Sequence, residues 1–141
     1  MITRKADVRW EGPLKTGRGS IKLGSGVALG MYSFGTRFET ASGTNPEELL
    51  GAAHAACFSM ALNAQLATAG HAAHHVSTTA EVQMDKVGSA MTIVGITLTT
   101  VAEVPGIKPE EFRRIAEDAK TNCIVSRALA SVPMTLTATL V

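Results

Sequence analysis

The chain contains two cysteines, Cys57 and Cys123, and a thiol is the side chain best suited to attack an oxidant. The reactive form is the thiolate, and because burial raises the pKa of a thiol, a buried reactive cysteine needs a positive charge nearby. His54, one helical turn before Cys57, could supply it, and so could Arg37, which lies between apolar residues in SFGTRFE. The alternative is an inert thiol, since free cysteine is among the most buried residue types.

The first cysteine lies in TNPEELLGAAHAACFSMALNAQLATAG, which we predict to be one long helix. Thr44 and Glu47 have the spacing of a capping box, with Thr44 as the N-cap, and Pro46 suits the first turn. The helix is expected to run to about Ala69 and to end at Gly70. The cysteine then lies about three turns from the helix N-terminus, beyond the reach of the helix dipole.

This helix has the length of a membrane span, because the segment 49–66 carries no charge. His54, Asn63 and Gln65 interrupt the segment, alanine supplies much of its apolar character, and no basic cluster flanks it. We therefore expect a helix buried in protein. The same helix from a second chain is the most economical cover for a helix that is apolar on nearly every side. Cover by the sheet and the other long helix is the alternative.

The other elements follow from hydrophobic periodicity. Residues 2–38 are expected to form short strands and tight turns, with one strand over 27–34. The segments 76–86, 91–103 and 134–141 alternate apolar and polar residues, and together these strands are expected to be antiparallel with one solvated face. A second helix is expected from Pro109, with Phe112, Ile115, Ala116 and Ala119 along one stripe, followed by a short helix from Ile124 to about Ala130. Residues 1–141 are expected to form a single α+β domain.

Composition excludes several classes of protein. The chain is 45% hydrophobic and 18% charged with a net charge of +1, which fits a globular protein and gives no reason to expect nucleic acid or an acidic membrane as partner. The beginning, MITRKADVRW, is not a signal peptide. Two cysteines without metal-ligand spacing make neither a disulfide scaffold nor a metal site, so we expect a cytoplasmic protein.

Three motifs carry a resemblance to a known family. TNPEELLGAAHAACFSMAL, the TRFE that precedes it and the late NCIVSRAL are similar to the osmotically inducible OsmC hydroperoxide reductases, and the order of elements agrees over essentially the whole chain. The OsmC branch is closer than the related organic hydroperoxide resistance proteins. The resemblance implies an α+β, OsmC-like fold in which antiparallel sheets pack around two central helices of an intertwined homodimer.

The resemblance also implies the function and the site. It implies a two-cysteine peroxidase without metal or haem, in which Cys57 is the peroxidatic cysteine and Cys123 the resolving one. Arg37 matches the arginine that activates the thiolate, and Glu48 the carboxylate that holds this arginine. The family commonly has proline after its second cysteine, whereas this chain has Ile124.

These roles agree with the chemistry of the side chains. A thiolate cleaves the O–O bond of a hydroperoxide and becomes a sulfenic acid, which a second thiol converts to a disulfide. Arg37 can stabilise the thiolate and the developing alkoxide, and the planar guanidinium suits bidentate pairing with Glu48. The apolar surroundings favour an organic hydroperoxide over hydrogen peroxide as the substrate. The resemblance implies a dithiol or a lipoyl-bearing protein as the reductant.

The spacing of Glu48 and Cys57 bears on where the site is built. Nine residues place them on opposite faces of a straight helix, separated by ~13 Å of rise. One helix cannot bring both to the same peroxide. If both serve one site, Glu48 and Arg37 are expected to come from the other subunit.

Two other functions use the same residues. One is a thiol redox sensor that signals through a disulfide, although the sequence contains no DNA-binding motif or basic patch as an output. The other is a non-catalytic dimer that binds an apolar ligand and has inert cysteines. His71, His74 and His75 follow the long helix in GHAAHH, and we expect them in a solvated loop rather than at a metal.

Overall fold

A computed structural model describes residues 1–141 as an α+β chain with six strands and four helices. The contacts divide the chain into two compact units, Met1–Leu49 and Leu50–Val141. The single domain over 1–141 therefore stays a prediction.

The first unit contains a three-stranded antiparallel sheet in the order β1 (Ala6–Glu11), β2 (Arg18–Leu23) and β3 (Ala28–Tyr32). The sheet has an aromatic pair at one end, because the rings of Trp10 and Tyr32 lie 5.5 Å apart. Gly19 pairs with Tyr32 in the ladder, and a Cβ atom at Gly19 would overlap the tyrosine ring. Only glycine leaves room for the aromatic pair.

The first unit also contains a short helix that the sequence pattern did not predict, α1 (Phe34–Phe38). The strand expected over 27–34 ends at Tyr32, because Ser33 caps this helix. The Ser33 hydroxyl accepts from the Thr36 N–H at 3.2 Å, and the Thr36 hydroxyl accepts from the Ser33 N–H at 2.9 Å. This capping box fixes the turn of helix that carries Arg37.

The long helix α2 (Pro46–Thr68) begins two residues after Thr44, so Thr44 is not its N-cap. Asn45 has that role: its side-chain oxygen accepts from the Glu48 N–H at 2.8 Å, and its carbonyl accepts from the Leu49 N–H at 3.2 Å. Asparagine is a better N-cap than threonine, which explains the difference of one residue. At the other end Gly70 has a φ of 87°, the left-handed conformation expected of the residue that ends a helix.

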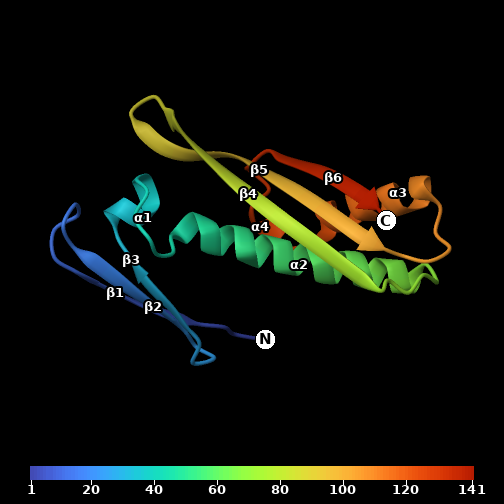
Figure 1. Cartoon of the computed structure of the whole chain (residues 1–141), viewed down its shortest axis with the longest axis horizontal. Helices are drawn as coiled ribbons and strands as arrows, with labels where there is room; N and C mark the ends of the chain where they lie inside the picture. The colour runs from blue at the N-terminus through green and yellow to red at the C-terminus, as the bar shows by residue number, and fades with distance from the viewer. The chain divides into compact units, whose positions relative to one another are not determined.

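The second unit contains a three-stranded sheet in the order β4 (His75–Val87), β5 (Ala90–Glu103) and β6 (Met134–Leu140). Figure 1 shows β4 and β5 as one long hairpin with β6 beside β5. The β4–β5 pair is antiparallel, as predicted, but β6 runs parallel to β5, so the expectation of antiparallel strands throughout was wrong. Two helices, α3 (Pro109–Asn122) and α4 (Ile124–Ala128), carry the chain from the end of β5 back to the start of β6 and make the parallel crossover possible.

One core holds the second unit together. Phe58, Leu62 and Leu66 of α2 are fully buried and belong to the same apolar cluster as residues from β5 and α3. The α3 stripe is buried as predicted, with Phe112, Ile115, Ala116 and Ala119 all in this cluster. By length and composition α2 could also cross a membrane. Only 28% of this apolar stretch is buried within the structure, so packing in the core covers part of its apolar surface.

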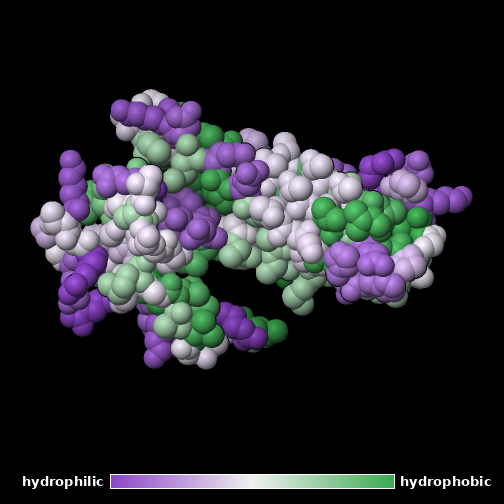
Figure 2. All heavy atoms as spheres, in the orientation of Figure 1, coloured by the Kyte–Doolittle hydropathy of each residue, from purple (hydrophilic) through white to green (hydrophobic).

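Apolar side chains also remain on the surface of each unit, as Figure 2 shows on one face. On α2, Met60 is 75% exposed. The exposed positions on either side of it are mostly alanines, with one polar residue among them: Ala52, Ala53, Ala56, Asn63, Ala64 and Ala67. This mainly apolar stripe of the long helix is not covered by its own unit.

Candidate functional site

The two cysteines meet although 66 residues separate them in the sequence. Cys57 lies in the middle of α2 and is partly buried, whereas Cys123 is buried and stands at the N-cap position of α4. Both are free thiols, and they lie close enough for each to shift the pKa of the other. Two thiols this close are arranged for disulfide chemistry.

The start of α4 lies beside Cys57 and lowers the pKa of its thiol. The first N–H groups of a helix have no partner within the helix and are free to bind an anion. Hydrogen bonding to the backbone of Val125 and Ile124 lowers the pKa of Cys57. Cys123 stands at the N-cap position, but its side chain makes no capping hydrogen bond. The turn NCIVS is therefore built to hold negative charge on sulfur.

The two thiols have pKa values shifted in opposite directions. Burial raises the pKa of Cys57, and its hydrogen bond to Cys123 raises it further. Burial also acts against the Cys123 thiolate, but hydrogen bonds from Cys57 and from the backbone and hydroxyl of Ser126 lower the pKa of Cys123 overall. The second unit by itself therefore favours the thiolate at Cys123, and Cys57 needs a further cation to become the stronger acid.

Ser126 and His54 extend the thiol pair into the protein interior. The Ser126 side chain lies near Cys123 and lowers the pKa of its thiol. The distance from Ser126 Oγ to His54 Nε2 is 2.7 Å. Both residues are buried, and burial lowers the pKa of His54. His54 is thus a neutral imidazole at physiological pH and does not supply the positive charge that the sequence analysis considered for it.

In the first unit, Arg37 is held by a carboxylate. Its Nε donates to both carboxylate oxygens of Glu47, at 2.9 and 3.2 Å, and its Nη2 donates to one of them. The Glu47 side chain is only 9% exposed, and the Arg37 guanidinium also lies 5.1 Å from the centre of the Phe38 ring. A guanidinium held at two nitrogens and against a ring has a fixed orientation.

Glu48, the predicted partner of Arg37, does not hold it in the structure. The Glu48 carboxylate is exposed and accepts from the Thr44 hydroxyl at 3.2 Å. Adjacent helical residues point about 100° apart, so only one of the two glutamates can face α1. The Asn45 cap sets the start of the helix, and with this start it is Glu47 that faces Arg37.

Arg37 also borders an apolar pocket within the first unit. The cavity has a volume of about 280 Å³ and is lined by Trp10, Leu14, Tyr32, Ser33, Phe34, Arg37 and Phe38. Its aromatic walls and single cation suit a molecule with an apolar tail and an oxygen-rich head.

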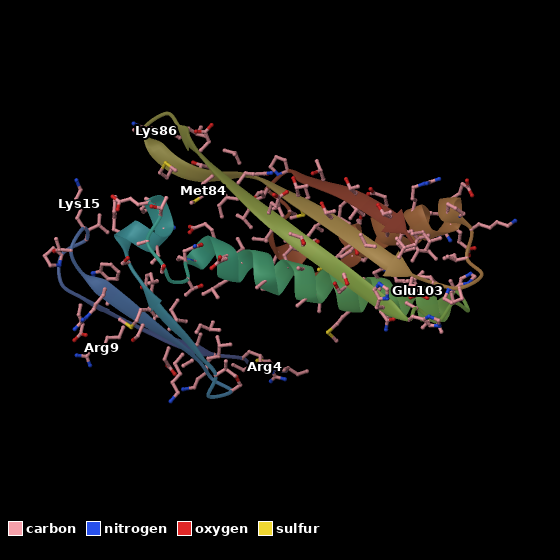
Figure 3. All side chains as sticks on the ribbon, viewed as in Figure 1. Arg4, Arg9, Lys15, Met84, Lys86 and Glu103 are labelled. Carbon is pink, nitrogen blue, oxygen red and sulfur yellow. The ribbon has the colours of Figure 1, made fainter.

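The three histidines after α2 lie beside acidic side chains. His74 lies 3.0 Å and His75 3.5 Å from the carboxylate of Glu103, which ends β5 (Figure 3), and His71 lies 3.5 Å from Glu111. No group of three or more potential metal ligands is present.

Sequence reasoning missed two residues of this arrangement, Glu47 and Ser126. Glu47 was attributed to the capping box and the helix dipole, and the signal that could have found it was the correct N-cap, Asn45. Ser126 follows Cys123 by three residues, about one helical turn, which brings two side chains of a helix start near each other. That spacing in NCIVS was available in the sequence.

The chain is similar to known proteins over most of its length. Residues 39–137 match the family model described as OsmC-like protein. Peroxiredoxin OsmC of Escherichia coli (strain K12) is 47% identical over 129 residues, which cover 91% of this chain and 90% of the relative.

Solved structures show the same fold. An organic hydroperoxide resistance protein from Elizabethkingia anophelis matches with a TM-score of 0.74 and 25% identity, over 100% of this chain and 98% of the other. An OsmC organic hydroperoxide resistance protein from Legionella pneumophila matches with a TM-score of 0.75 and 22% identity, over 99% and 98%. The family match over most of the chain, together with the thiol pair at the start of α4, establishes that this chain belongs to the OsmC family.

Proposed function

We propose that this protein is a thiol-dependent peroxidase that reduces organic hydroperoxides, and hydrogen peroxide less well. The observation that carries the proposal is the contact between the free thiols of Cys57 and Cys123 at the start of α4. The match to a relative named peroxiredoxin supports the same chemistry.

In the first step the Cys57 thiolate attacks the terminal oxygen of the hydroperoxide. An S–O bond forms, the O–O bond breaks, and an alkoxide leaves and takes up a proton to become the alcohol. Cys57 is assigned this role because it is the more exposed of the two sulfur atoms. The N–H groups of Ile124 and Val125 help to hold the charge of its thiolate.

In the second step Cys123 attacks the sulfenic acid on Cys57. An S–S bond forms, the S–O bond breaks, and water leaves once the hydroxide has taken up a proton. Their contact in the reduced protein supports this pairing. A dithiol or a lipoyl-bearing protein then reduces the disulfide, and two thiols are restored at the expense of the reductant.

The cation for Cys57 is Arg37, oriented by Glu47. Ten residues separate Glu47 from Cys57 on α2, which corresponds to ~15 Å of rise in a straight helix. A guanidinium anchored on Glu47 therefore suits the Cys57 of a second copy better than that of its own chain. Glu47 in place of Glu48 as the partner of Arg37 therefore still requires a site shared between two chains.

A homodimer would also cover the exposed small-residue face of α2. If two copies of α2 pack antiparallel, the beginning of one helix lies beside the middle of the other, which is what a site with Arg37 from one chain and Cys57 from the other requires. The aromatic pocket at Arg37 would receive the apolar tail of the organic hydroperoxide. The two free thiols suit a reducing compartment, so we expect the protein in the cytoplasm.

The test is to titrate the reduced protein with tert-butyl hydroperoxide in the presence of a dithiol. A peroxidase consumes the hydroperoxide in repeated turnover for as long as the dithiol lasts. A redox sensor reacts once with about one equivalent and recovers slowly, and a non-catalytic ligand-binding protein consumes none. Either of the last two results contradicts the proposal.

A further inference from the structure

His54 and Ser126 form a buried hydrogen bond that the two steps described above do not use. Nε2 of His54 and Oγ of Ser126 lie 2.7 Å apart, although 72 residues separate them in the sequence. His54 is 0% and Ser126 5% exposed, so no solvent competes for this bond. The Ser126 side chain also lies close enough to Cys123 to lower the pKa of its thiol. Histidine, serine and the second thiol thus form one continuous chain of polar groups.

The other ring nitrogen of His54 gives this chain a direction. Nδ1 is buried and has no hydrogen-bond partner. Buried N–H groups without an acceptor are rarer than unsatisfied acceptors, so the proton of the neutral ring belongs on Nε2, where the Ser126 oxygen can accept it. The Ser126 hydroxyl hydrogen is then free to point at the Cys123 sulfur. The direction of donation is from His54 to Ser126 and from Ser126 to Cys123.

We propose that His54 and Ser126 are positioning residues for the second step: the neutral His54 ring fixes the Ser126 hydroxyl as a donor to Cys123, so that Cys123 is held as a thiolate aimed at the sulfenic acid of Cys57. This inference rests on the proposed peroxidase function. It assigns to His54 a role toward the resolving thiol, in place of the cationic role toward Cys57.

The balance of the step fits a neutral histidine. The Cys123 thiolate loses an electron pair to the new S–S bond, so its sulfur is oxidised while the Cys57 sulfur is reduced. The hydroxide that leaves Cys57 takes up the proton that Cys123 gave up on ionisation, and no net proton is left on His54. Burial lowers the pKa of His54, which agrees with a ring that donates a hydrogen bond and stays uncharged.

The experiment separates the two steps in a single turnover without reductant. Reduced protein is mixed with one equivalent of tert-butyl hydroperoxide, and the sulfenic acid is trapped with dimedone and followed by mass spectrometry. In Ser126→Ala the sulfenic acid should persist about ten times longer than in the wild type, because one hydrogen bond to a charged group is lost, while the rate of the first oxidation stays the same.

Ser59→Ala is the matched control. Ser59 lies two residues after Cys57 on α2, and its hydroxyl donates to Thr78 at 2.8 Å rather than to either thiol. It should leave the sulfenic acid lifetime at the wild-type value. If Ser126→Ala behaves like Ser59→Ala, or if it slows the first oxidation as much as the second step, the proposal is overturned.

A second measurement does not depend on peroxide at all. In the Cys57→Ser background Cys123 is the only thiol, and its thiolate absorbance can be followed against pH. Adding Ser126→Ala should raise the pKa of Cys123, and adding Ser59→Ala should not. If the wild type does not turn over peroxide but the pKa of Cys123 still rises in Ser126→Ala, the proposed peroxidase function is contradicted and the role of Ser126 is kept. If the wild type turns over peroxide but the pKa does not rise, the role of Ser126 is contradicted and the peroxidase function is kept.

Two variants of His54 test the role of the histidine. They also test the proposed positioning of Cys123 if Ser126→Ala does not fold. Gln has an amide N–H near the position of Nε2, whereas Leu has none. His54→Gln should restore most of the resolving rate, and His54→Leu should be about three- to tenfold slower in the second step only. Equal rates in the two variants would show that His54 serves packing alone.

Discussion

At the scale of single residues, Cys57 and Cys123 differ chiefly in what surrounds their sulfur atoms. The backbone of Val125 and Ile124 lowers the pKa of Cys57 by hydrogen bonding, whereas Cys57 and the Ser126 side chain lower the pKa of Cys123. Burial and the contact with Cys123 raise the pKa of Cys57. A peroxidatic Cys57 therefore depends on a cation that its own turn of α2 does not provide.

The N–H of Ile124 is one of the donors to Cys57, and proline at this position would remove it. Ile124→Pro should raise the pKa of Cys57 and slow the first oxidation several-fold at neutral pH, because less thiolate is present. Proline is tolerated in the first turn of a helix, so α4 should persist. Thiolate absorbance against pH in the Cys123→Ser background measures the shift. Ile124→Val keeps the N–H and is the control, and equal pKa values in the two variants would remove this donor from the account.

The two neighbouring glutamates provide a matched pair for the arginine. Glu47→Gln weakens the bidentate contact with Arg37 and should reduce the rate of peroxide attack about tenfold or more, because the cation loses its fixed orientation. Glu48→Gln makes the same change one residue away and should have little effect, since Glu48 contacts only Thr44 and the Asn45 cap. The second-order rate constant with tert-butyl hydroperoxide is the measurement. A larger loss in Glu48→Gln would restore the partner predicted from the sequence.

At the scale of elements, α2 carries the thiol and also anchors the core. Its buried and exposed faces differ clearly: Leu62 is 0% exposed, and Met60 is 75% exposed. Leu62→Ala should lower the free energy of unfolding by about 2–5 kcal/mol, because it leaves a cavity between the helix and the sheet. Met60→Ala should change the stability of the monomer by less than about 1 kcal/mol. Urea denaturation at low protein concentration makes the comparison, and similar losses in both variants would contradict the orientation of α2.

Periodicity predicted the elements that have one dry face, and it failed where local polar chemistry decides. The α3 stripe and the alternation of β6 follow from the apolar positions alone. The direction of β6 does not, because alternation is the same in parallel and antiparallel strands. The short helix α1 was missed because five residues contain too little periodicity, although Ser33 and Thr36 are spaced as a capping pair.

The same limit applies to the site. The two cysteines were identified from their motifs, and their contact could not be derived from spacing, since it depends on how α2 and α4 pack. The partner of Arg37 was wrong by one residue because the helix start was wrong by one residue. A helix turns about 100° per residue, so an error of one position at the N-cap changes which side chain faces a neighbour.

At the scale of the whole molecule, the proposed site is assembled from two chains. Neither Arg37→Ala nor Cys57→Ser should be active alone, but mixing them under conditions that exchange chains should restore activity. About half of the dimers would be mixed and each would have one intact site, so the recovery should approach about a quarter of the wild-type rate. Chain exchange is verified by mass labelling. With exchange verified, activity no higher than that of the separate variants would show that each site is built within one chain.

The central claim is the division of labour between Cys57 and Cys123, and intact mass after one equivalent of tert-butyl hydroperoxide tests it most directly. The wild type should lose two hydrogens on forming the disulfide, Cys123→Ser should gain one oxygen as a stable sulfenic acid, and Cys57→Ser should keep its mass and leave the hydroperoxide unconsumed. Consumption of the hydroperoxide by Cys57→Ser at the wild-type rate would contradict the assignment of Cys57 as the residue that attacks the peroxide.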